Sequence, residues 1–170
     1  MVSNDIKVNW MDLKSYSTFI PMLLRAMSIT DGPVIELGSG PSSTPLLHWL
    51  CKEQKRRLFT YEKDPDFYRV FRRFRSGYHS ISLVESWAEF NTRRSWSVAL
   101  IDHDIEEENA RAKTALRLRN KADFILLHDS DHEDLYGYGK IYDKFKYKYT
   151  WKFARPWTTV VSNLKEMPWE

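Results

Sequence analysis

The stretch that decides the fold of this chain is Val34-Ile35-Glu36-Leu37-Gly38-Ser39-Gly40-Pro41-Ser42-Ser43-Thr44-Pro45. Its β-branched start predicts a buried strand, and the two glycines predict a tight turn that a ligand can approach closely. Thr44 and Pro45 predict the start of a helix, with Thr44 as its N-terminal cap. A strand, a glycine turn and a helix N-terminus in this order are typical of sites that hold nucleotide-type cofactors.

The residues around the glycine turn also bear on which cofactor it would hold. A dinucleotide-binding turn has a third glycine three residues after the second, and Ser43 stands at that position here. Glu36 lies two residues before Gly38, where a carboxylate repels a phosphate and suits a cationic ligand group. These residues argue against a nicotinamide dinucleotide. An ordinary strand–turn–helix connection without a ligand is the other reading of the stretch.

Composition predicts one soluble domain over residues 1–170, with an N-terminal helix over 11–28 and a core over 33–163. The chain has 170 residues, of which 42% are hydrophobic and 29% charged, and this suits a globular fold with a full core. A single cysteine excludes a disulfide within the chain. The lack of a membrane-length apolar run and of a signal-peptide core predicts a cytoplasmic protein without a membrane partner. The net charge of +3 is too small to argue for a nucleic-acid partner.

Predicted strands alternate with predicted helices along the chain. Strands are predicted from Val34 and over residues 56–61, 79–84, 96–101, 124–127, 149–154 and 158–162. Helices are predicted over 11–28, after Thr44, over 64–77 and over 105–121, and residues 131–145 are expected to form a loop followed by a helix. This alternation predicts an α/β fold with a doubly wound, mostly parallel sheet.

Two helix starts carry clear signals. Asp64 followed by Pro65 predicts a capped start for the helix over 64–77. In the first helix, Pro21 must lie in the first turn, so we expect Ser17 or Thr18 to act as the cap.

Acidic residues follow most of the predicted strands. Glu36, Glu62, Glu85, Asp102 and Asp129 stand at successive strand ends, and ligands in parallel sheets bind beyond these ends. Glu62 lies near the ~20-residue offset after a glycine turn at which an acid contacts ribose hydroxyls. A carboxylate can accept both hydroxyl protons in charge-assisted hydrogen bonds. We expect Glu62 to bind the ribose of a cofactor, with Lys63 in the same site; a helix-capping role before Asp64 is the alternative.

The run Glu36-Leu37-Gly38-Ser39-Gly40 resembles motif I of the class I S-adenosylmethionine-dependent methyltransferases, and the following Pro41-Ser42-Ser43-Thr44 is similar to their small-molecule O-methyltransferase branch. The resemblance implies a Rossmann-like seven-stranded sheet that ends in an antiparallel hairpin, with S-adenosylmethionine as cofactor. It places the methionine end of the cofactor at Glu36, Gly38, Ser39, Gly40 and Ser43. It places the adenine near Ser86, Trp87 and His103, although Trp87 also suits a helix-face core residue.

The ends of the fourth and fifth strands resemble metal-dependent branches of the same family. Asp102-His103 is similar to the Asp-His pair of catechol-type O-methyltransferases, and His128-Asp129 to the His-Asp pair of the sugar-acting branch. The resemblance implies that Asp102 and Asp129 bind Mg²⁺, which would favour a deprotonated substrate hydroxyl. Hydrogen bonding of these acids in a cofactor loop without a metal is the alternative.

The catalytic base is the point at which the chain departs from both branches. They place a lysine or a histidine just after the acid of the fourth strand, and this chain has Ile105 there. Isoleucine cannot take a proton, so we expect Asp104 or His128 to act as the base.

These residues together predict methyl transfer from S-adenosylmethionine to an oxygen of a small-molecule acceptor. Two alternatives stay open: a protein that binds the cofactor without transferring its methyl group, and an RNA or protein methyltransferase. The second is motivated by four arginines on one predicted helix: Arg69, Arg72, Arg73 and Arg75. The acceptor and the oligomeric state are not determined by the sequence, although aromatic residues near the C-terminus (Trp151, Trp157 and Trp169) suit an oligomer interface.

Overall fold

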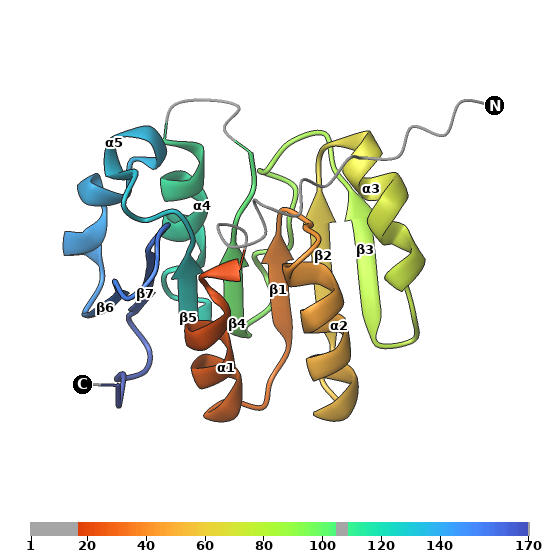
Figure 1. The fold of residues 1–170 in the computed structure, drawn as a ribbon, viewed down its shortest axis with the longest axis horizontal. Helices are drawn as coiled ribbons and strands as arrows, with labels where there is room; N and C mark the ends of the chain where they lie inside the picture. The colour runs from red at the N-terminus through yellow and green to blue at the C-terminus, as the bar shows by residue number, and fades with distance from the viewer. Residues whose placement is uncertain (1–16, 105–108, 170) are drawn as a thin grey trace.

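The computed structural model describes residues 17–104 and 109–169, which form one seven-stranded sheet between two layers of helices (Figure 1). The strands are β1 (Val34–Leu37), β2 (Leu58–Glu62), β3 (His79–Leu83), β4 (Trp96–Ile101), β5 (Ala122–Leu127), β6 (Tyr147–Trp151) and β7 (Thr158–Ser162). Their order in the sheet is β3-β2-β1-β4-β5-β7-β6, and β7 runs in the direction opposite to the other six strands. The predicted α/β fold, with a mostly parallel sheet that ends in an antiparallel hairpin, is confirmed.

Helices cover both faces of the sheet. They are α1 (Ile20–Ser28), α2 (Ser43–Glu53), α3 (Pro65–Phe71), α4 (Ala110–Leu118) and α5 (Glu133–Tyr136), with short 3-10 segments at Arg72–Phe74, Tyr138–Lys140 and Tyr142–Lys144. Residues of α1 and α2 pack on one face, and Figure 1 shows both helices in front of the sheet. Residues of α4 and of the segment 136–145 pack on the other face.

The central strands are buried on both faces because helices cover both. In β4, Val98 and Leu100 pack toward α1 and α2, whereas Ala99 and Ile101 pack toward α4. Every residue of β1, β4 and β7 is buried. This explains why residues 98–101 of β4 and 124–127 of β5 are continuously apolar rather than alternating, whereas β7 is equally buried but includes Thr158, Thr159 and Ser162.

Two predicted helix caps are wrong, and one is confirmed. The first residue of α2 is Ser43, and the hydroxyl of Thr44 donates to Glu36 and accepts from the Gly40 N–H instead of capping the helix. The start of α1 has no side-chain cap, because the hydroxyl of Thr18 bonds to Pro156 and His128. Asp64 caps α3 as predicted, with its carboxylate accepting from two backbone N–H groups.

Element boundaries differ from the prediction at several places. The helix predicted over 105–121 is α4, which covers Ala110–Leu118; residues 105–108, like 11–16 of the predicted first helix, lie outside the described residues. The segment 131–145 forms α5 and two 3-10 turns, with Gly137 at a φ of 71° directly after α5. Within the described chain, no helix has the length and apolar character needed to cross a membrane.

Arg56 is a buried cation that ties the entry of β1 to the entry of β2. Its side chain donates to the carbonyl oxygen of Gly32 at 2.7 Å and to those of Met27 and Thr30 at 3.2 Å. Met27 lies in the last turn of α1, and Thr30 and Gly32 lie between α1 and β1. Since Arg56 is only 3% exposed, these hydrogen bonds replace the water that its guanidinium loses on folding.

We expect Arg56→Met to lower the free energy of unfolding by about 2–4 kcal/mol, because it leaves several buried carbonyl groups without donors. Arg57→Met is the matched control, since Arg57 is adjacent and exposed; it should change stability by less than about 0.5 kcal/mol. Urea denaturation of the three proteins tests this. Equal losses in both variants would show that the buried hydrogen bonds of Arg56 are not the cause.

Candidate functional site

A cavity of about 330 Å³ lies at the carboxyl edge of the sheet, beside the ends of β1 and β4. The strand order reverses between these two strands, and parallel sheets bind ligands at such a reversal. The cavity is lined by residues from four strand–helix segments, those of β1–α2, β2–α3, β4–α4 and β5–α5: Gly38, Ser39, Gly40, Pro41, Glu62, Phe67, Asp102, His103, Asp104, Arg111, His128, Asp129 and Tyr136.

Gly38 forms the floor of the cavity and requires glycine for two reasons. Its φ is 92°, a conformation that side chains disfavour. A Cβ atom at this position would also lie 2.5 Å from the carbonyl oxygen of Asp102 and 2.7 Å from the Cα of His103. The end of β1 therefore packs directly on the backbone that follows β4.

Glu62 forms one wall and fixes the glycine turn. One carboxylate oxygen accepts from the N–H and hydroxyl of Ser39 at 2.7 and 2.6 Å. The other accepts from the N–H groups of Lys63 and Asp64 at 2.7 and 2.8 Å. Burial raises the pKa of Glu62, although these donors oppose the shift. The predicted juxtaposition of Glu62 and the turn is thus present, with the carboxylate already bound by the chain itself.

His103 stacks on Trp87, and this pair lies between two cavities. The ring centroids are 4.2 Å apart and the planes differ by 18°. His103 lines the first cavity, whereas Trp87 lines a second cavity together with Ser86, Lys113 and other residues. The three residues predicted to surround adenine are therefore divided between the two cavities.

The protonation state of His103 follows from its hydrogen bonds. Its Nδ1 lies 2.9 Å from the carbonyl oxygen of Asp104, which can only accept, so Nδ1 carries the proton. Its Nε2 then accepts from the hydroxyl of Thr114 at 3.0 Å. Burial lowers the pKa of His103 to about 4, so the ring is neutral at pH 7.

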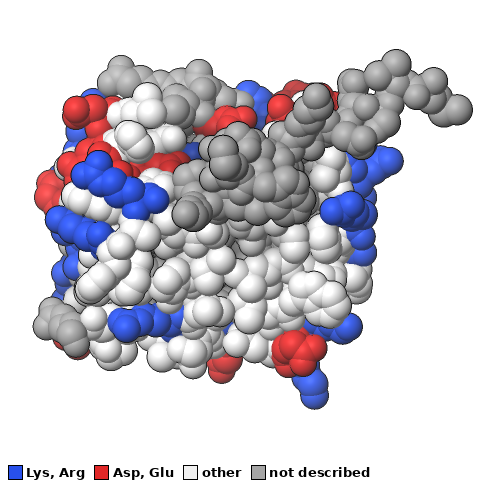
Figure 2. Space-filling view, viewed as in Figure 1, with Lys and Arg blue, Asp and Glu red and all other residues white. Residues whose placement is uncertain are grey.

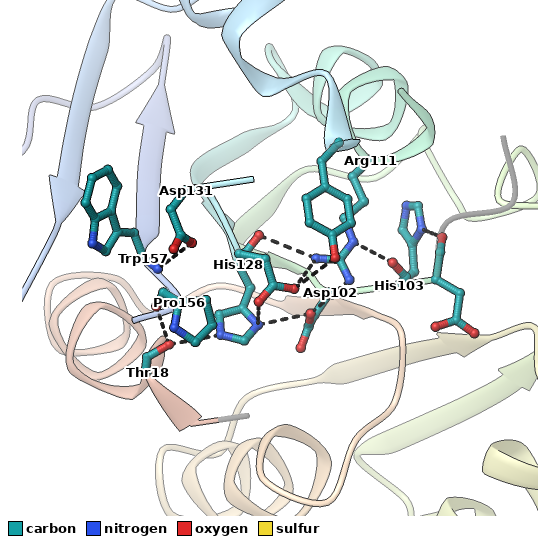
Figure 3. A network of polar contacts seen from close by, with 11 residues as sticks. Thr18, Asp102, His103, Arg111, His128, Asp131, Pro156 and Trp157 are labelled. Carbon is teal, nitrogen blue, oxygen red and sulfur yellow. Dashed lines mark hydrogen bonds and ion pairs between the residues drawn. The ribbon is translucent and has the colours of Figure 1, made fainter. Parts of the chain in front are cut away.

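Four charged side chains form the opposite wall (Figure 3). Arg111 lies 3.2 Å from a carboxylate oxygen of Asp102 and 3.0 Å from one of Asp129. The Arg111 side chain is only 6% exposed, and its guanidinium also packs on the ring of Tyr136 at 4.0 Å. His128 completes the group, which we call the Arg111 cluster: Asp102, Arg111, His128 and Asp129.

His128 is positively charged in this arrangement. Thr18 gives its only hydroxyl proton to the carbonyl oxygen of Pro156 at 2.6 Å, so it must accept from Nε2 of His128 at 3.0 Å. Nδ1 of His128 lies 3.1 Å from Asp102, and a carboxylate can only accept. Both ring nitrogens therefore donate. Although burial opposes the charge, Asp102 and Asp129 raise the pKa of His128.

The charge balance of the Arg111 cluster does not fit a divalent cation. Oxygen or nitrogen atoms of Asp102, His128 and Asp129 lie within 4.8 Å of one another, close enough to share an ion. However, Arg111 and the protonated His128 already balance the two carboxylates. Burial alone would raise the pKa of Asp102, but His128 and Arg111 outweigh it and hold that pKa below its usual value. The predicted Mg²⁺ site is not supported by these contacts.

Five of the predicted cofactor residues do not line the first cavity. Ser86 and Trp87 line the second cavity, and Glu36, Ser43 and Lys63 line neither. Glu36 is fully buried below the turn, where it accepts hydrogen bonds from Thr44 and Thr60. Since Glu36 does not line the cavity, a cationic ligand group there could interact with its carboxylate only through another group between them.

A chain of hydrogen bonds leads from Glu36 to the surface. Thr60 donates to Glu36 at 2.6 Å and lies 2.9 Å from Nε2 of His79. Nδ1 of His79 lies 3.1 Å from Nδ1 of His48, whose Nε2 lies 2.7 Å from the hydroxyl of Tyr78. When Glu36 is ionised, Thr60 donates to it, His79 donates to Thr60, His48 donates to His79, and Tyr78 donates to His48. In this arrangement each histidine carries one ring proton and is neutral. No sequence pattern predicted that these side chains form one network.

Four residues of the site were not predicted from the sequence: Arg111, Tyr136, Phe67 and Thr18. Arg111 stands in the first turn of α4, between Ala110 and Ala112. Two small neighbours around an arginine are the only local sign that the side chain is buried. Thr18 and Tyr136 come from segments far from the strand ends, and no spacing rule connects them to His128 or Asp129.

Three solved structures share the fold at low sequence identity. A Staphylococcus aureus protein, provisionally described as a caffeoyl-CoA O-methyltransferase, is 8% identical with a TM-score of 0.59, over 85% of this chain and 81% of that chain. Human methyltransferase-like protein 13, in complex with SAH, is 16% identical with a TM-score of 0.54, over 90% of this chain and 78% of that chain. A Streptococcus pneumoniae protein, provisionally described as a tRNA (m1A22) methyltransferase, is 13% identical with a TM-score of 0.54, over 88% of this chain and 72% of that chain.

Sequence comparison adds no closer relation. No protein family and no curated protein matches the sequence. The chain therefore has the fold of these methyltransferases, and at such identities the likeness extends to the fold alone.

We expect Mg²⁺ to leave the melting temperature unchanged, because the Arg111 cluster is already electrically balanced. The measurement is thermal unfolding with excess Mg²⁺ and, separately, with EDTA. A rise in melting temperature with Mg²⁺ that the Asp129→Asn variant abolishes would restore the metal site.

Glu36 gives a prediction about pH. Burial raises its pKa from 4.5 to about 7, so the folded state binds more protons than the unfolded state between these values. This group therefore lowers the stability of the wild type as the pH rises from 4.5 to 7. Glu36→Gln lacks this effect, so its stability relative to the wild type should increase by roughly 2–4 kcal/mol across that window.

Urea denaturation at several pH values measures this difference. Glu53→Gln is the control, since Glu53 is exposed on α2 and should show no such trend. A difference between Glu36→Gln and wild type that stays constant with pH would contradict the raised pKa.

Proposed function

We propose that this protein is an S-adenosylmethionine-dependent methyltransferase. The observation that carries the proposal is the placement of the glycine turn, Glu62 and Asp102-His103 around one cavity at the reversal of strand order. These residues come from the connections after β1, β2 and β4. The same cofactor is supported by the resemblance of residues 36–40 to motif I and by the fold that the chain shares with the three methyltransferases.

The residues around the cavity fit the parts of this cofactor. Gly38 and Gly40 give a turn that a ligand can approach closely, at the N-terminal end of α2. Glu62 offers carboxylate oxygens to ribose hydroxyls, which would replace the hydroxyl of Ser39 as donors. The neutral ring of His103 and the ring of Phe67 supply flat surfaces on the cavity wall. S-adenosylmethionine, when bound, supplies an electrophilic methyl group.

The protein's own part in the reaction is mainly positioning. Methyl transfer requires the acceptor atom in line with the methyl group, and holding this geometry lowers the barrier substantially. The Arg111 cluster is a rigid, balanced wall that fixes the backbone after β4 and β5, since Arg111 also donates to the carbonyl oxygens of His103 and His128. The acceptor would lie against this wall.

Of the two predicted bases, Asp104 suits the role better than His128. His128 already holds a proton on each ring nitrogen, so it cannot take another. Asp104 is exposed and lines the cavity. The acceptor predicted from the sequence is an oxygen of a small molecule, here without metal assistance. RNA is the second acceptor class, because the similar structures include one described as a tRNA methyltransferase beside one described as an O-methyltransferase.

Calorimetric titration with S-adenosylhomocysteine, the demethylated product, tests the cofactor. We expect binding of this compound and no binding of NAD. Glu62→Gln should weaken the binding by roughly 1–3 kcal/mol, because it removes the charge from the acceptor of the ribose hydroxyls.

Glu53→Gln is the control for this titration, because it removes an exposed carboxylate of α2 and should bind as the wild type does. Thermal unfolding of Glu62→Gln without ligand separates a folding defect from a binding defect. Wild-type protein that binds neither compound would refute the proposed cofactor.

A further inference from the structure

The loop that joins β6 to β7 lies beside the candidate site. Since β7 is antiparallel to both β5 and β6, the latter two strands run in the same direction, and both end at the edge that carries the cavity. The N–H of Trp157 donates to the carboxylate of Asp131 at 2.9 Å, and the N–H of Ser130 donates to the Trp157 carbonyl at 2.9 Å. Figure 3 shows Pro156 and Trp157 beside His128 and Asp131.

This hairpin loop, which we define as residues 151–157, carries one exposed ring, Phe153, and two exposed cations, Lys152 and Arg155, whereas the rings of Trp151 and Trp157 are half-buried. Phe153 is 84% exposed, and its ring lies 4.6 Å from that of Trp151. The cations of Lys152 and Arg155 lie 4.6 and 5.2 Å from the ring of Trp157. A phenylalanine this exposed gains nothing from the core of its own chain, so its ring is available to a partner.

The adjoining edge strand continues the positive charge. Lys148 lies in β6 and is exposed, and Lys146 and Lys152 are the exposed residues directly before and after this strand. Lys148 packs over the ring of Tyr142 at 4.5 Å, and Lys146 over that of Tyr147 at 4.7 Å. Figure 2 shows lysine and arginine side chains on the side of β6 and β7, with acidic side chains beside them in the upper part of the view.

We propose that the hairpin loop docks single-stranded RNA and leads it to the cavity. Rings that stack on bases, interleaved with cations that contact phosphates, are the combination by which proteins bind single strands without reading their sequence. A duplex does not fit Phe153, because its bases are already stacked. An acidic peptide would pair with the cations of Lys152 and Arg155, but its carboxylates would not stack on the exposed ring of Phe153. That the bound strand is also the methyl acceptor rests on the proposed function; the docking itself does not.

Fluorescence anisotropy of a short labelled single-stranded RNA, titrated with the full chain, tests the docking. We expect Phe153→Ala to weaken binding by roughly fivefold or more, through the loss of one stacked base. The double variant Lys152→Gln/Arg155→Gln should also bind more weakly and show a smaller dependence of affinity on salt. Phe153 and the two cations are exposed, so these variants should melt as the wild type does.

The control is Arg72→Gln/Arg75→Gln, which removes two exposed cations beside α3, on the opposite edge of the sheet. It should bind the RNA as the wild type does. An equal loss in this control, or equal affinity for duplex and single strand, would show unspecific charge attraction and overturn the proposal. So would competition by a polyglutamate peptide at the same charge concentration as the RNA.

Titration with S-adenosylhomocysteine on the same samples separates the two proposals. Binding of that compound without RNA binding would overturn the docking surface and leave the proposed function intact, with a small-molecule acceptor favoured. RNA binding that Phe153→Ala weakens, without binding of the cofactor product, would support the docking surface and refute the proposed function. If both bind, methylation of the RNA should fall in Phe153→Ala while its affinity for S-adenosylhomocysteine stays unchanged.

Discussion

The close approach of Gly38 to the carbonyl oxygen of Asp102 is the constraint on which the rest of the site depends. A side chain at this position would collide with the backbone that follows β4, so only glycine lets the ends of β1 and β4 meet. The hydrogen bond from the Asp102 N–H to the Leu37 carbonyl holds the two ends together. Glu62 then fixes the turn from the side of β2, and Arg111 fixes the backbone of His103 from the side of α4. The cavity is the space these contacts leave open.

The sequence predicted most of the fold and one part of the site. Central strands such as β4 and β5 are long apolar runs, and helix starts such as Asp64-Pro65 carry local chemistry, so both can be read without a structure. The strand-end rule also placed Gly38, Glu62, Asp102 and Asp129 around one cavity. Contacts over long sequence separations could not be predicted. The bond between Thr18 and His128 spans 110 residues, and it changes both the cap of α1 and the charge of His128.

Two buried polar networks lie near the cavity, one in its wall and one below the glycine turn, and they stabilise buried charge in different ways. The Arg111 cluster pairs two acids with two cations, which makes the group neutral as a whole. Glu36 instead accepts hydrogen bonds from the hydroxyls of Thr44 and Thr60, which carry no charge, and burial raises its pKa to about 7. Burial disfavours the charged form of a carboxylate, so a buried carboxylate without a cation beside it binds a proton near neutral pH.

Arg111 differs from a metal ion in being tethered to the chain. A free ion exchanges with the solvent and occupies its site according to its concentration, whereas a side chain anchored on α4 faces its partners at a fixed, high effective concentration. The charge of this wall is therefore supplied by folding rather than by the ionic composition of the surroundings. The other consequence is mechanical. Any movement of α4 away from the sheet would separate Arg111 from Asp102 and Asp129. The two ion pairs therefore favour the position in which α4 is packed on the sheet.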